Sequence, residues 1–294
     1  MARHKPIERQ VIVITGASSG IGLATALTAA EKGATVVMLA RSEQTLAEIA
    51  EEIRASGGHA LALTVDVGDA DAVAEAVDRI VADFGRIDTW VNNAGVSIYG
   101  SLDEIGLKDA RRLFDTNFWG VVHGSLAALP HLRRENGALI NVGSEVSEAV
   151  VPLQGMYTAS KHAVKGFTDA LRVEVENVDR SGMSVVLIQP TAVNTPFPEH
   201  ARNYMSREPK LPDPQIDPAQ VAAAIIEAAQ SGGRDIKVGS MARLNVMASR
   251  LMPRVADRLS ARQVDKQQLD EAPIRPQGTL YEAGQAGRVH GSHR

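Results

Sequence analysis

Two side chains four positions apart, Tyr157 and Lys161, form the pair in this sequence best suited to move a proton. They lie in a stretch of helical period from Met156 to Val178, so both emerge on one face, one turn apart. A phenol with a pKa near ~10 is a poor proton shuttle at neutral pH, but a neighbouring ammonium favours the phenolate and lowers that pKa. Tyr157 is therefore a candidate acid/base group. On spacing alone, an exposed helical pair with no catalytic role is the simpler interpretation.

A glycine-rich turn is the second chemical feature. It has the sequence Thr15-Gly16-Ala17-Ser18-Ser19-Gly20-Ile21-Gly22 and joins a β-branched run to an alanine-rich helical segment. A turn without bulky side chains lets a pyrophosphate approach the backbone N–H groups at a helix start. The glycines are spaced G-x-x-x-G-x-G rather than G-x-G-x-x-G, but their position after a first strand favours nucleotide binding over a plain turn. The candidate contacts are Gly16, Ser18, Ser19, Gly20, Ile21 and Gly22.

The elements that must position these groups follow an alternating pattern. Short β-branched runs alternate with longer segments of helical period, which is typical of βαβ units. The apolar runs are continuous, as expected for strands buried on both faces of a parallel sheet, so we predict a doubly wound α/β fold with about seven strands. The expected strands cover residues 11–14, 35–39, 60–65, 89–92, 137–142, 183–189 and 236–238, and the expected helices 21–32, 43–55, 70–84, 107–132, 156–178 and 218–230.

Further polar motifs stand at the ends of the predicted strands and within one helix. Together with the glycine turn and the tyrosine–lysine pair, they form an ordered set that resembles the short-chain dehydrogenase/reductase family in its compact single-domain form. The resemblance spans about Ile7 to Val238. The additional motifs are Asp66-Val67 after the third strand, Asn92-Asn93-Ala94-Gly95 after the fourth, Ser144 after the fifth, and Asn117 in the long helix.

The resemblance implies a fold and an activity. It implies a Rossmann-type catalytic domain over residues 7–239 and an NAD(P)-dependent oxidoreductase that interconverts a small-molecule carbonyl and a secondary alcohol by hydride transfer. In that family pattern Tyr157 exchanges a proton with the substrate oxygen, and Lys161 also bonds the nicotinamide ribose. Ser144 would hold the substrate oxygen, unless it is an ordinary loop serine. Asn117 would hold a water linking Lys161 to solvent, unless it is only a polar residue that bends the helix.

The same resemblance assigns the remaining cofactor contacts. Asp66 would reach the adenine amino group, with Val67 beside the ring. The motif from Asn92 to Gly95 can also be a simple turn after a strand. Thr191 departs from the family pattern, in which a glycine is usual, and leaves the local backbone path open. The other expected contacts are Asn93, Ala94 and Gly95 on the adenosine and ribose side, and Pro190, Val193 and Thr195 at the nicotinamide, where the Val193 backbone and the Thr195 side chain hold the carboxamide.

The end of the second strand bears on the choice between NADP(H) and NAD(H). An acid at this position would bind the ribose 2′-hydroxyl of NAD, but the sequence has Arg41-Ser42. A guanidinium can pair with a 2′-phosphate through charge-assisted bonds. Ser19 does not supply the second basic charge of some NADP-preferring relatives, and a solvated arginine at a helix start is the alternative. The sequence predicts that NADP(H) is preferred and that NAD(H) use is possible.

Composition excludes several other classes of function. The 294 residues are 44% hydrophobic and carry a formal net charge of −4, so we expect a sizeable core and no nucleic-acid partner. The absence of cysteine removes disulfides and thiolate ligands, and no metal site is expected. The first ten residues have the character of a solvated leader without a signal-peptide core. No apolar run is long enough to cross a bilayer, so a soluble, cytoplasmic protein is expected.

Two stretches depart from the α/β pattern. Residues 194–217 are polar and rich in proline, and we predict that they form a substrate lid. Residues 240–294 form a C-terminal extension, in which 241–262 has the pattern of a basic amphipathic helix divided at Pro253. The end of the chain, with His290 and His293, is expected to be irregular and solvated. The amphipathic segment could dock on its own protein or on a twin subunit of an expected homo-oligomer, or make weak contact with a membrane surface.

Two other functions compete with the NADP(H)-dependent oxidoreductase. One is an NADP-binding sensor or scaffold without turnover, and the other is a peripheral membrane oxidoreductase anchored by the basic segment. A pure binding protein would not need all four of Asn117, Ser144, Tyr157 and Lys161. The sequence does not name the substrate, because a pocket can take many carbonyl compounds on one fold.

Overall fold

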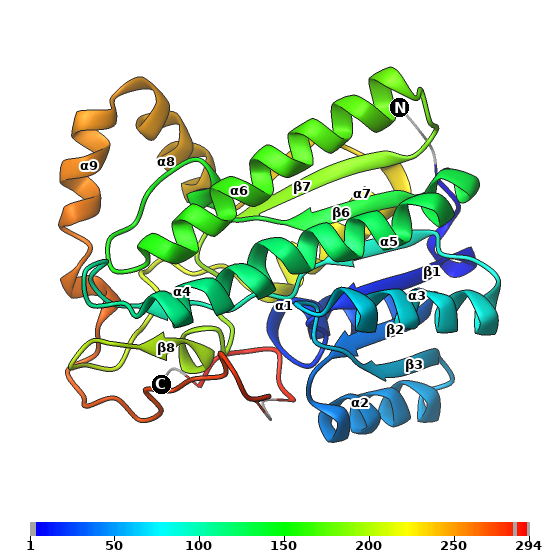
Figure 1. Ribbon diagram of the computed structural model, residues 1–294, viewed down its shortest axis with the longest axis horizontal. Helices are drawn as coiled ribbons and strands as arrows, with labels where there is room; N and C mark the ends of the chain where they lie inside the picture. Colours follow the sequence, from blue (N-terminus) through cyan, green and yellow to red (C-terminus); the bar gives the residue numbers. More distant parts are fainter. Residues whose placement is uncertain (1–3, 285–286, 293–294) are drawn as a thin grey trace.

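Seven parallel strands form the central sheet of the computed structural model, which describes residues 4–284 and 287–292 (Figure 1). Across the sheet the strands are ordered β3-β2-β1-β4-β6-β7-β9. This arrangement confirms the predicted doubly wound α/β fold. The strand bounds are β1 Val11–Thr15, β2 Thr35–Ala40, β3 His59–Thr64, β4 Thr89–Asn92, β6 Ala138–Val142, β7 Ser184–Pro190 and β9 Asp235–Val238.

Helices cover both faces of this sheet (Figure 1). In β1, Ile12 and Ile14 belong to the apolar cluster on one face, whereas Val11 and Val13 belong to the cluster on the other. Both faces are thus buried, which is why the strand segments are continuously apolar in the sequence. On the first face lie α1 Gly20–Glu31, α2 Glu43–Ala55 and α7 Pro218–Ser231, and on the second lie α3 Ala70–Phe84, α5 Gly120–Glu135 and α6 Gly155–Arg172.

The strand order reverses between β1 and β4, and the turns that follow these two strands meet there. The Asn93 side chain donates hydrogen bonds to the carbonyl oxygens of Thr15 (2.9 Å) and Gly16 (3.2 Å). In return the Thr15 hydroxyl accepts from the backbone N–H groups of Asn93 and Ala94, each at 3.0 Å. In open α/β sheets a ligand crevice forms at such a switch point, outside the carboxyl ends of the strands.

Residues 107–132, expected to form one or two long helices, contain two helices joined by a wider turn. α4 (Leu107–Phe114) passes through a π-helical turn, Asp115–Trp119, into α5. Asn117 lies inside this turn. π-Helical turns are rare and often mark functional positions, because the extra residue shifts side chains relative to the regular helix.

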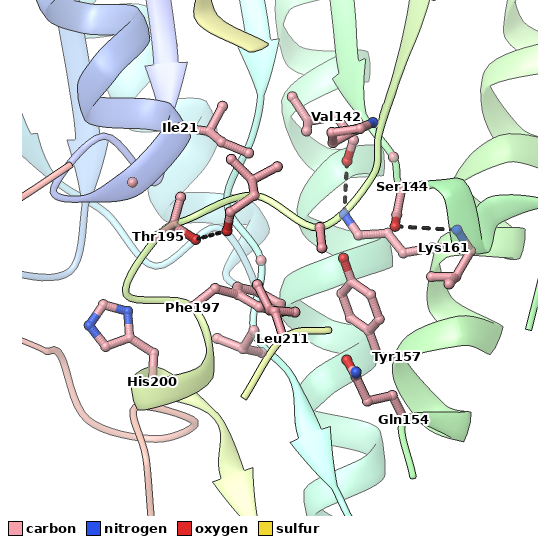
Figure 2. A pocket seen from close by; sticks show the side chains of 18 of the residues that line it. Ile21, Val142, Ser144, Gln154, Tyr157, Lys161, Thr195, Phe197, His200 and Leu211 are labelled. Atoms are coloured by element: carbon pink, nitrogen blue, oxygen red, sulfur yellow. Dashed lines mark hydrogen bonds between the residues drawn. The ribbon is translucent and has the colours of Figure 1, made fainter. Parts of the chain in front are cut away.

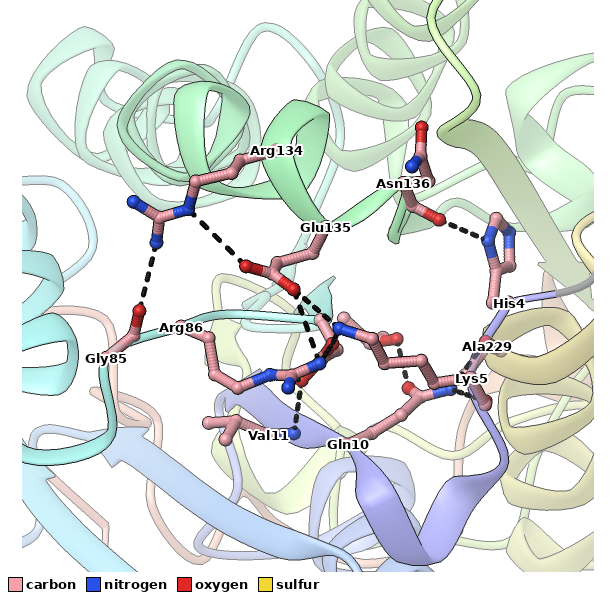
Figure 3. A network of polar contacts seen from close by, with 12 residues as sticks. His4, Lys5, Gln10, Val11, Gly85, Arg86, Arg134, Glu135, Asn136 and Ala229 are labelled. Carbon is pink, nitrogen blue, oxygen red and sulfur yellow. Dashed lines mark hydrogen bonds and ion pairs between the residues drawn. The ribbon is translucent and has the colours of Figure 1, made fainter.

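The first residues of the described chain are packed against the domain, so the predicted solvated leader is wrong (Figure 3). Ile7 is buried, and the Gln10 side chain donates to the Ala229 carbonyl at 3.0 Å. Lys5 pairs with Asp88 and Glu135. Hydrogen bonds and ion pairs with buried partners hold this segment in place. The composition of the segment does not reveal these partners.

The predicted lid segment, residues 194–217, contains a short strand that the sequence analysis did not expect. β8 (Arg202–Asn203) pairs in parallel with β5 (Ile98–Tyr99), which follows β4. A second link joins the ends of the segment, where Val193 bridges to Ile216. The segment is therefore held at its middle and at its base.

The C-terminal extension begins with two short helices, α8 (Ser240–Leu251) and α9 (Pro253–Ala261). The break falls at Pro253 as predicted, because proline cannot donate the helical hydrogen bond. The side chains at positions 243, 244 and 250, part of the predicted amphipathic pattern, lie outside the described residues. Within the described chain, no helix combines the length and apolar character needed to cross a membrane.

Beyond Gln267 the described residues form neither helix nor strand, as expected for the irregular tail. They nevertheless make specific contacts across the carboxyl edge of the sheet. His290 is exposed, as predicted, and its Nε2 lies 3.1 Å from Oδ2 of Asp217, the residue that caps α7. His293 lies outside the described residues.

Candidate active site

Tyr157 and Lys161 lie on α6 and face the carboxyl end of β6 (Figure 2). Lys161 is buried, and its Nζ donates a hydrogen bond to the Val142 carbonyl at 2.8 Å. The same nitrogen lies 5.7 Å from the centroid of the Tyr157 ring. The Tyr157 hydroxyl points toward Lys161 and Ser144 (Figure 2). The pair identified from its spacing is therefore part of the interior and not an exposed helical pair.

Burial sets the proton affinities of this pair. It raises the pKa of Tyr157 to about 12, a rise that the Ser144 hydroxyl opposes and the Glu145 carboxylate increases. Burial also lowers the pKa of Lys161 to about 8. The expected lowering of the tyrosine pKa by Lys161 is wrong for this state of the site, because withdrawal from water disfavours the charged form of each group. At neutral pH the phenol is protonated, and Lys161 is largely an ammonium.

Asn117 is fully buried and holds the loop after β4 against α6. Its Oδ1 accepts from the Val96 N–H at 2.8 Å, and its Nδ2 donates to the Val96 carbonyl (2.9 Å) and to the Ser160 hydroxyl (3.1 Å). The Ser160 hydroxyl in turn donates to the Tyr157 carbonyl at 2.7 Å. Asn117 thereby ties Ser160 of α6 to the loop after β4. Its role in a water relay stays a prediction.

Ser144 caps the 3-10 turn Glu145–Ser147 that follows β6. Its hydroxyl accepts from the Val146 N–H at 3.3 Å, and its own N–H donates to the Ser147 hydroxyl at 3.2 Å. This reciprocal capping fixes the backbone of Ser144 at the mouth of the sheet. The hydroxyl keeps its own proton to donate toward Tyr157 or a substrate oxygen.

A cavity of about 310 Å³ connects the glycine turn with Tyr157. It is the space that a dinucleotide and a substrate would share. Two of the predicted residues, Gly22 and Asn117, do not line it. The predicted residues that do are Gly16, Ser18, Ser19, Gly20, Ile21, Arg41, Asp66, Val67, Asn93, Ala94, Gly95, Ser144, Tyr157, Lys161, Pro190, Val193 and Thr195.

The glycine turn has the shape that close approach of a phosphate requires. Gly16 adopts a φ of +66°, and a Cβ there would lie 2.7 Å from the Ala94 Cα. Gly22 packs inside the turn, where a Cβ would lie 2.2 Å from the Gly16 carbonyl oxygen. The glycines therefore keep side chains away from the start of α1, which fits a pyrophosphate. In this structure the Gly20 N–H donates to the Arg288 carbonyl of the C-terminal tail at 3.0 Å.

Arg41 and Asp66 lie at the adenosine end of the cavity, but neither is free. Asp66 pairs with Arg112 and accepts from the Gly68 N–H at 3.0 Å. Burial alone would raise the pKa of Asp66, yet these contacts hold it below its usual value. Arg41 is half-buried and donates to main-chain carbonyls of the C-terminal tail. It is therefore not the solvated helix-start arginine that the sequence left as an alternative.

At the other end of the cavity, the chain continues past Pro190 without distortion at Thr191. The Thr191 N–H donates to the Val238 carbonyl at 3.1 Å, which extends the pairing of β7 with β9. Thr195 Oγ1 donates to the Val193 carbonyl at 3.3 Å. With threonine at this position, the backbone continues the pairing of β7 with β9.

A family model described as short chain dehydrogenase matches residues 10–205. The chain belongs to this family. YxnA, an uncharacterized oxidoreductase of Bacillus subtilis (strain 168), is 43% identical over 285 residues, which cover 95% of this chain and 80% of the relative. This short-chain dehydrogenase is accordingly an oxidoreductase.

Solved structures of short-chain and alcohol dehydrogenases are also similar to this chain. A short chain dehydrogenase/reductase from Burkholderia phymatum in complex with NAD is 27% identical, with a TM-score of 0.75 over 84% of this chain and 96% of that chain. An alcohol dehydrogenase from the archaeon Thermococcus sibiricus, complexed with 5-hydroxy-NADP, is 28% identical, with a TM-score of 0.68 over 78% of this chain and 94% of that chain.

The predicted lid segment, residues 194–217, brings two apolar side chains to the site. The Phe197 ring lies 5.4 Å from the Tyr157 ring, and Leu211 also lines the cavity (Figure 2). The sequence analysis singled out the segment but neither of these two residues. Arg112 and the cavity-lining residue Thr279 had no signal, because they reach the adenosine end only through the tertiary fold.

Proposed function

We propose that this protein is an NADP(H)-dependent oxidoreductase that interconverts a carbonyl and a secondary alcohol, with Tyr157 as the acid/base group. One observation carries the proposal. The Tyr157 hydroxyl points toward Ser144 and Lys161 in a cavity that extends to the glycine turn (Figure 2). A substrate oxygen placed beside these side chains would meet hydrogen-bond donors within reach of the cofactor.

Bound NADP(H) supplies or accepts the hydride at the substrate carbon. The protein handles the substrate oxygen and its proton. Because the pKa of Tyr157 is about 12, its hydroxyl is protonated at neutral pH and can donate to the oxygen of a reduced carbonyl. Ser144 orients that oxygen, and the Lys161 ammonium stabilises the phenolate that remains. In alcohol oxidation the same groups act in the reverse sense.

The preference for NADP(H) over NAD(H) rests on Arg41. Its guanidinium lines the adenosine end of the cavity. The residue directly after β2 is this arginine and not an acid that would bind a ribose 2′-hydroxyl. Ser42 is buried and donates to the Thr45 hydroxyl at 2.8 Å, so it supports the start of α2. A 2′-phosphate at this position would gain charge-assisted hydrogen bonds that a hydroxyl cannot match.

Residues 194–217 act as the substrate lid in this proposal. Phe197 and Leu211 bring apolar surface toward Tyr157, and Pro212 also lines the cavity. Closure of such a segment excludes water from the site of hydride transfer. Bound cofactor and substrate should therefore protect this segment from proteolysis, whereas cleavage independent of ligand would contradict a lid.

The direct test is a panel of carbonyl compounds and alcohols, followed by nicotinamide absorbance with both NADP and NAD forms. We expect turnover with at least one class, and faster turnover with the NADP form. The sensor or scaffold alternative predicts cofactor binding without turnover across the panel. A Tyr157→Phe control that keeps full activity would remove Tyr157 from the proposed role.

A peripheral membrane oxidoreductase is the second candidate, favoured by one observation. α8 and α9 expose large apolar side chains, and α9 also exposes Arg254 and Arg258, as an interfacial helix does. Sedimentation with anionic liposomes tests this directly, and recovery of all the protein in the supernatant would contradict it. The exposed apolar residues are Met247, Leu251, Met252, Val255 and Leu259.

A further inference from the structure

A single main-chain oxygen of the C-terminal tail lies between two guanidinium groups at the adenosine end of the cavity. The Leu280 carbonyl accepts from Arg41 Nη1 at 3.3 Å and from Arg112 Nε at 3.2 Å. The carbonyls of Thr279 and Glu282 accept from Arg41 Nη2. The tail thus satisfies the donors that a cofactor phosphate would otherwise use.

This part of the tail, residues 276–284, is here named the strap, and it lies beside β8 (Figure 1). Its main apolar anchor is Leu280, which is fully buried against Val96, Ile98 and Leu113. The Thr279 N–H donates to the His200 carbonyl at 2.8 Å. The other described strap residues are partly or fully exposed. Hydrogen bonds from Asn203 and Arg202 to the Pro276 carbonyl, and from the Tyr281 hydroxyl to Asp109, also hold the strap. Leu280 is its one buried apolar side chain, so the loss of this anchor should loosen the strap at the two arginines.

The guanidinium pair is not neutralised by the strap. Arg41 and Arg112 bring two positive charges, and Asp66 is the acid that pairs with Arg112 and attracts Arg41. A carbonyl dipole satisfies N–H donors but carries no net charge. A phosphate with one to two negative charges forms stronger hydrogen bonds with guanidinium groups, so it can compete for the same donors.

We propose that the strap is a cofactor-specificity element, in which the Leu280 carbonyl occupies the Arg41–Arg112 pair and must be displaced by a nucleotide bearing a 2′-phosphate. A nucleotide with a 2′-hydroxyl leaves the strap in place. The inference rests on the proposed NADP(H) site and adds a competitor that lowers its affinity for the phosphate. The strap therefore reduces the difference in affinity between NADP and NAD that Arg41 alone would create.

Two ligands that differ only in the 2′-phosphate isolate this effect: adenosine 2′,5′-bisphosphate and adenosine 5′-monophosphate. Gly278→Ala displaces the strap, because Gly278 has a φ of +54° and a Cβ there would lie 2.4 Å from the His200 carbonyl oxygen. Leu280→Ser removes the apolar anchor and gives a second route to the same state. Ile274→Ala changes an exposed side chain before the strap and serves as the matched control.

Titration calorimetry of the full-length proteins at one ionic strength measures both affinities. We expect Gly278→Ala and Leu280→Ser to bind the bisphosphate about tenfold tighter than the parent, since each hydrogen bond to a charged group is worth on the order of a factor of ten. Their affinity for the monophosphate should change less than about twofold, and Ile274→Ala should match the parent for both ligands. An unchanged or weaker bisphosphate affinity in both variants overturns the inference, as does an equal gain for both ligands.

Hydrogen exchange in the parent protein tests the same displacement without a variant. The bisphosphate should speed amide exchange in a peptide spanning residues 276–284, whereas the monophosphate should not. Slower exchange with the bisphosphate would mean that the strap clamps the phosphate, and would overturn the inference. Binding of neither nucleotide would instead contradict the proposed cofactor site itself, which separates the two failures.

Discussion

The catalytic end of α6 and the strap are built in different ways. Lys161 is 4% exposed and bonded to the end of a central strand, and Asn117 ties Ser160 of α6 to the loop after β4. The strap has one buried apolar anchor, and main-chain carbonyls make its contacts with Arg41. The proposed proton chemistry would thus depend on the core, whereas the proposed choice of cofactor would depend on a segment that can be displaced.

The largest expected effect comes from making the same chemical change in both regions. Tyr157→Phe removes the proton-donating hydroxyl, so kcat should fall by roughly a thousandfold or more while cofactor binding is kept. Tyr281 follows the strap anchor, and its hydroxyl donates to Asp109 at 2.8 Å on the surface. Tyr281→Phe at saturating cofactor should leave kcat within about twofold. Equal losses of kcat in the two variants would contradict the view that proton transfer depends on the core and not on the strap.

The second prediction concerns how much the burial of Lys161 lowers the free energy of unfolding. Its folded pKa of about 8 lies below the ordinary value of 10.5, so the unfolded chain binds more protons between these two pH values. The free energy of unfolding of the parent should therefore rise relative to Lys161→Met as pH increases from 8 to 10.5, by about 3 kcal/mol at most. Denaturant unfolding of both proteins at pH 7 to 10 measures the difference, and parallel curves would contradict the lowered pKa.

The third prediction tests Arg41, where the strap meets the cofactor site. Arg41→Ala should reduce the preference for NADP over NAD by roughly ten- to a hundredfold, because it removes hydrogen bonds to a charged phosphate. The kcat/KM values for both cofactors at one ionic strength give this ratio. A parent that prefers NAD would leave Arg41 as a structural contact of the C-terminal tail, and a variant that loses both cofactors equally would make it a general phosphate contact.

The smallest effect is expected where the extension meets the substrate side of the cavity. Gln267 is fully buried, accepts from the Gln154 side chain at 2.9 Å and donates to the Pro152 carbonyl at 3.0 Å. Gln267→Ala leaves both partners unpaired, which should lower the free energy of local opening there by about 1 to 3 kcal/mol. Native-state hydrogen exchange should show faster opening near residues 265–269 with little change in α6. An equal change in α6 would show that the extension and the core open as one unit.

Much of the core could be predicted from the sequence, since its signals are local. The helix ending at Gly85 and the strand from Thr89 to Asn92 were located because a helix stop and a β-branched run are each encoded within a few residues. The spacing of Tyr157 and Lys161 placed them on one helical face for the same reason. The packing of Lys5 and Gln10, by contrast, was missed because their partners lie far away in the chain.

By itself, then, the sequence determined the order of strands and helices, the glycine turn and the facing pair on α6, because periodicity and backbone sterics act over one or two turns of chain. Only the tertiary structure decided that burial raises the pKa of Tyr157 and lowers that of Lys161. It also decided that Arg41 meets Leu280, 239 positions away. Burial and long-range pairing depend on what the whole fold brings together, and no local pattern records them.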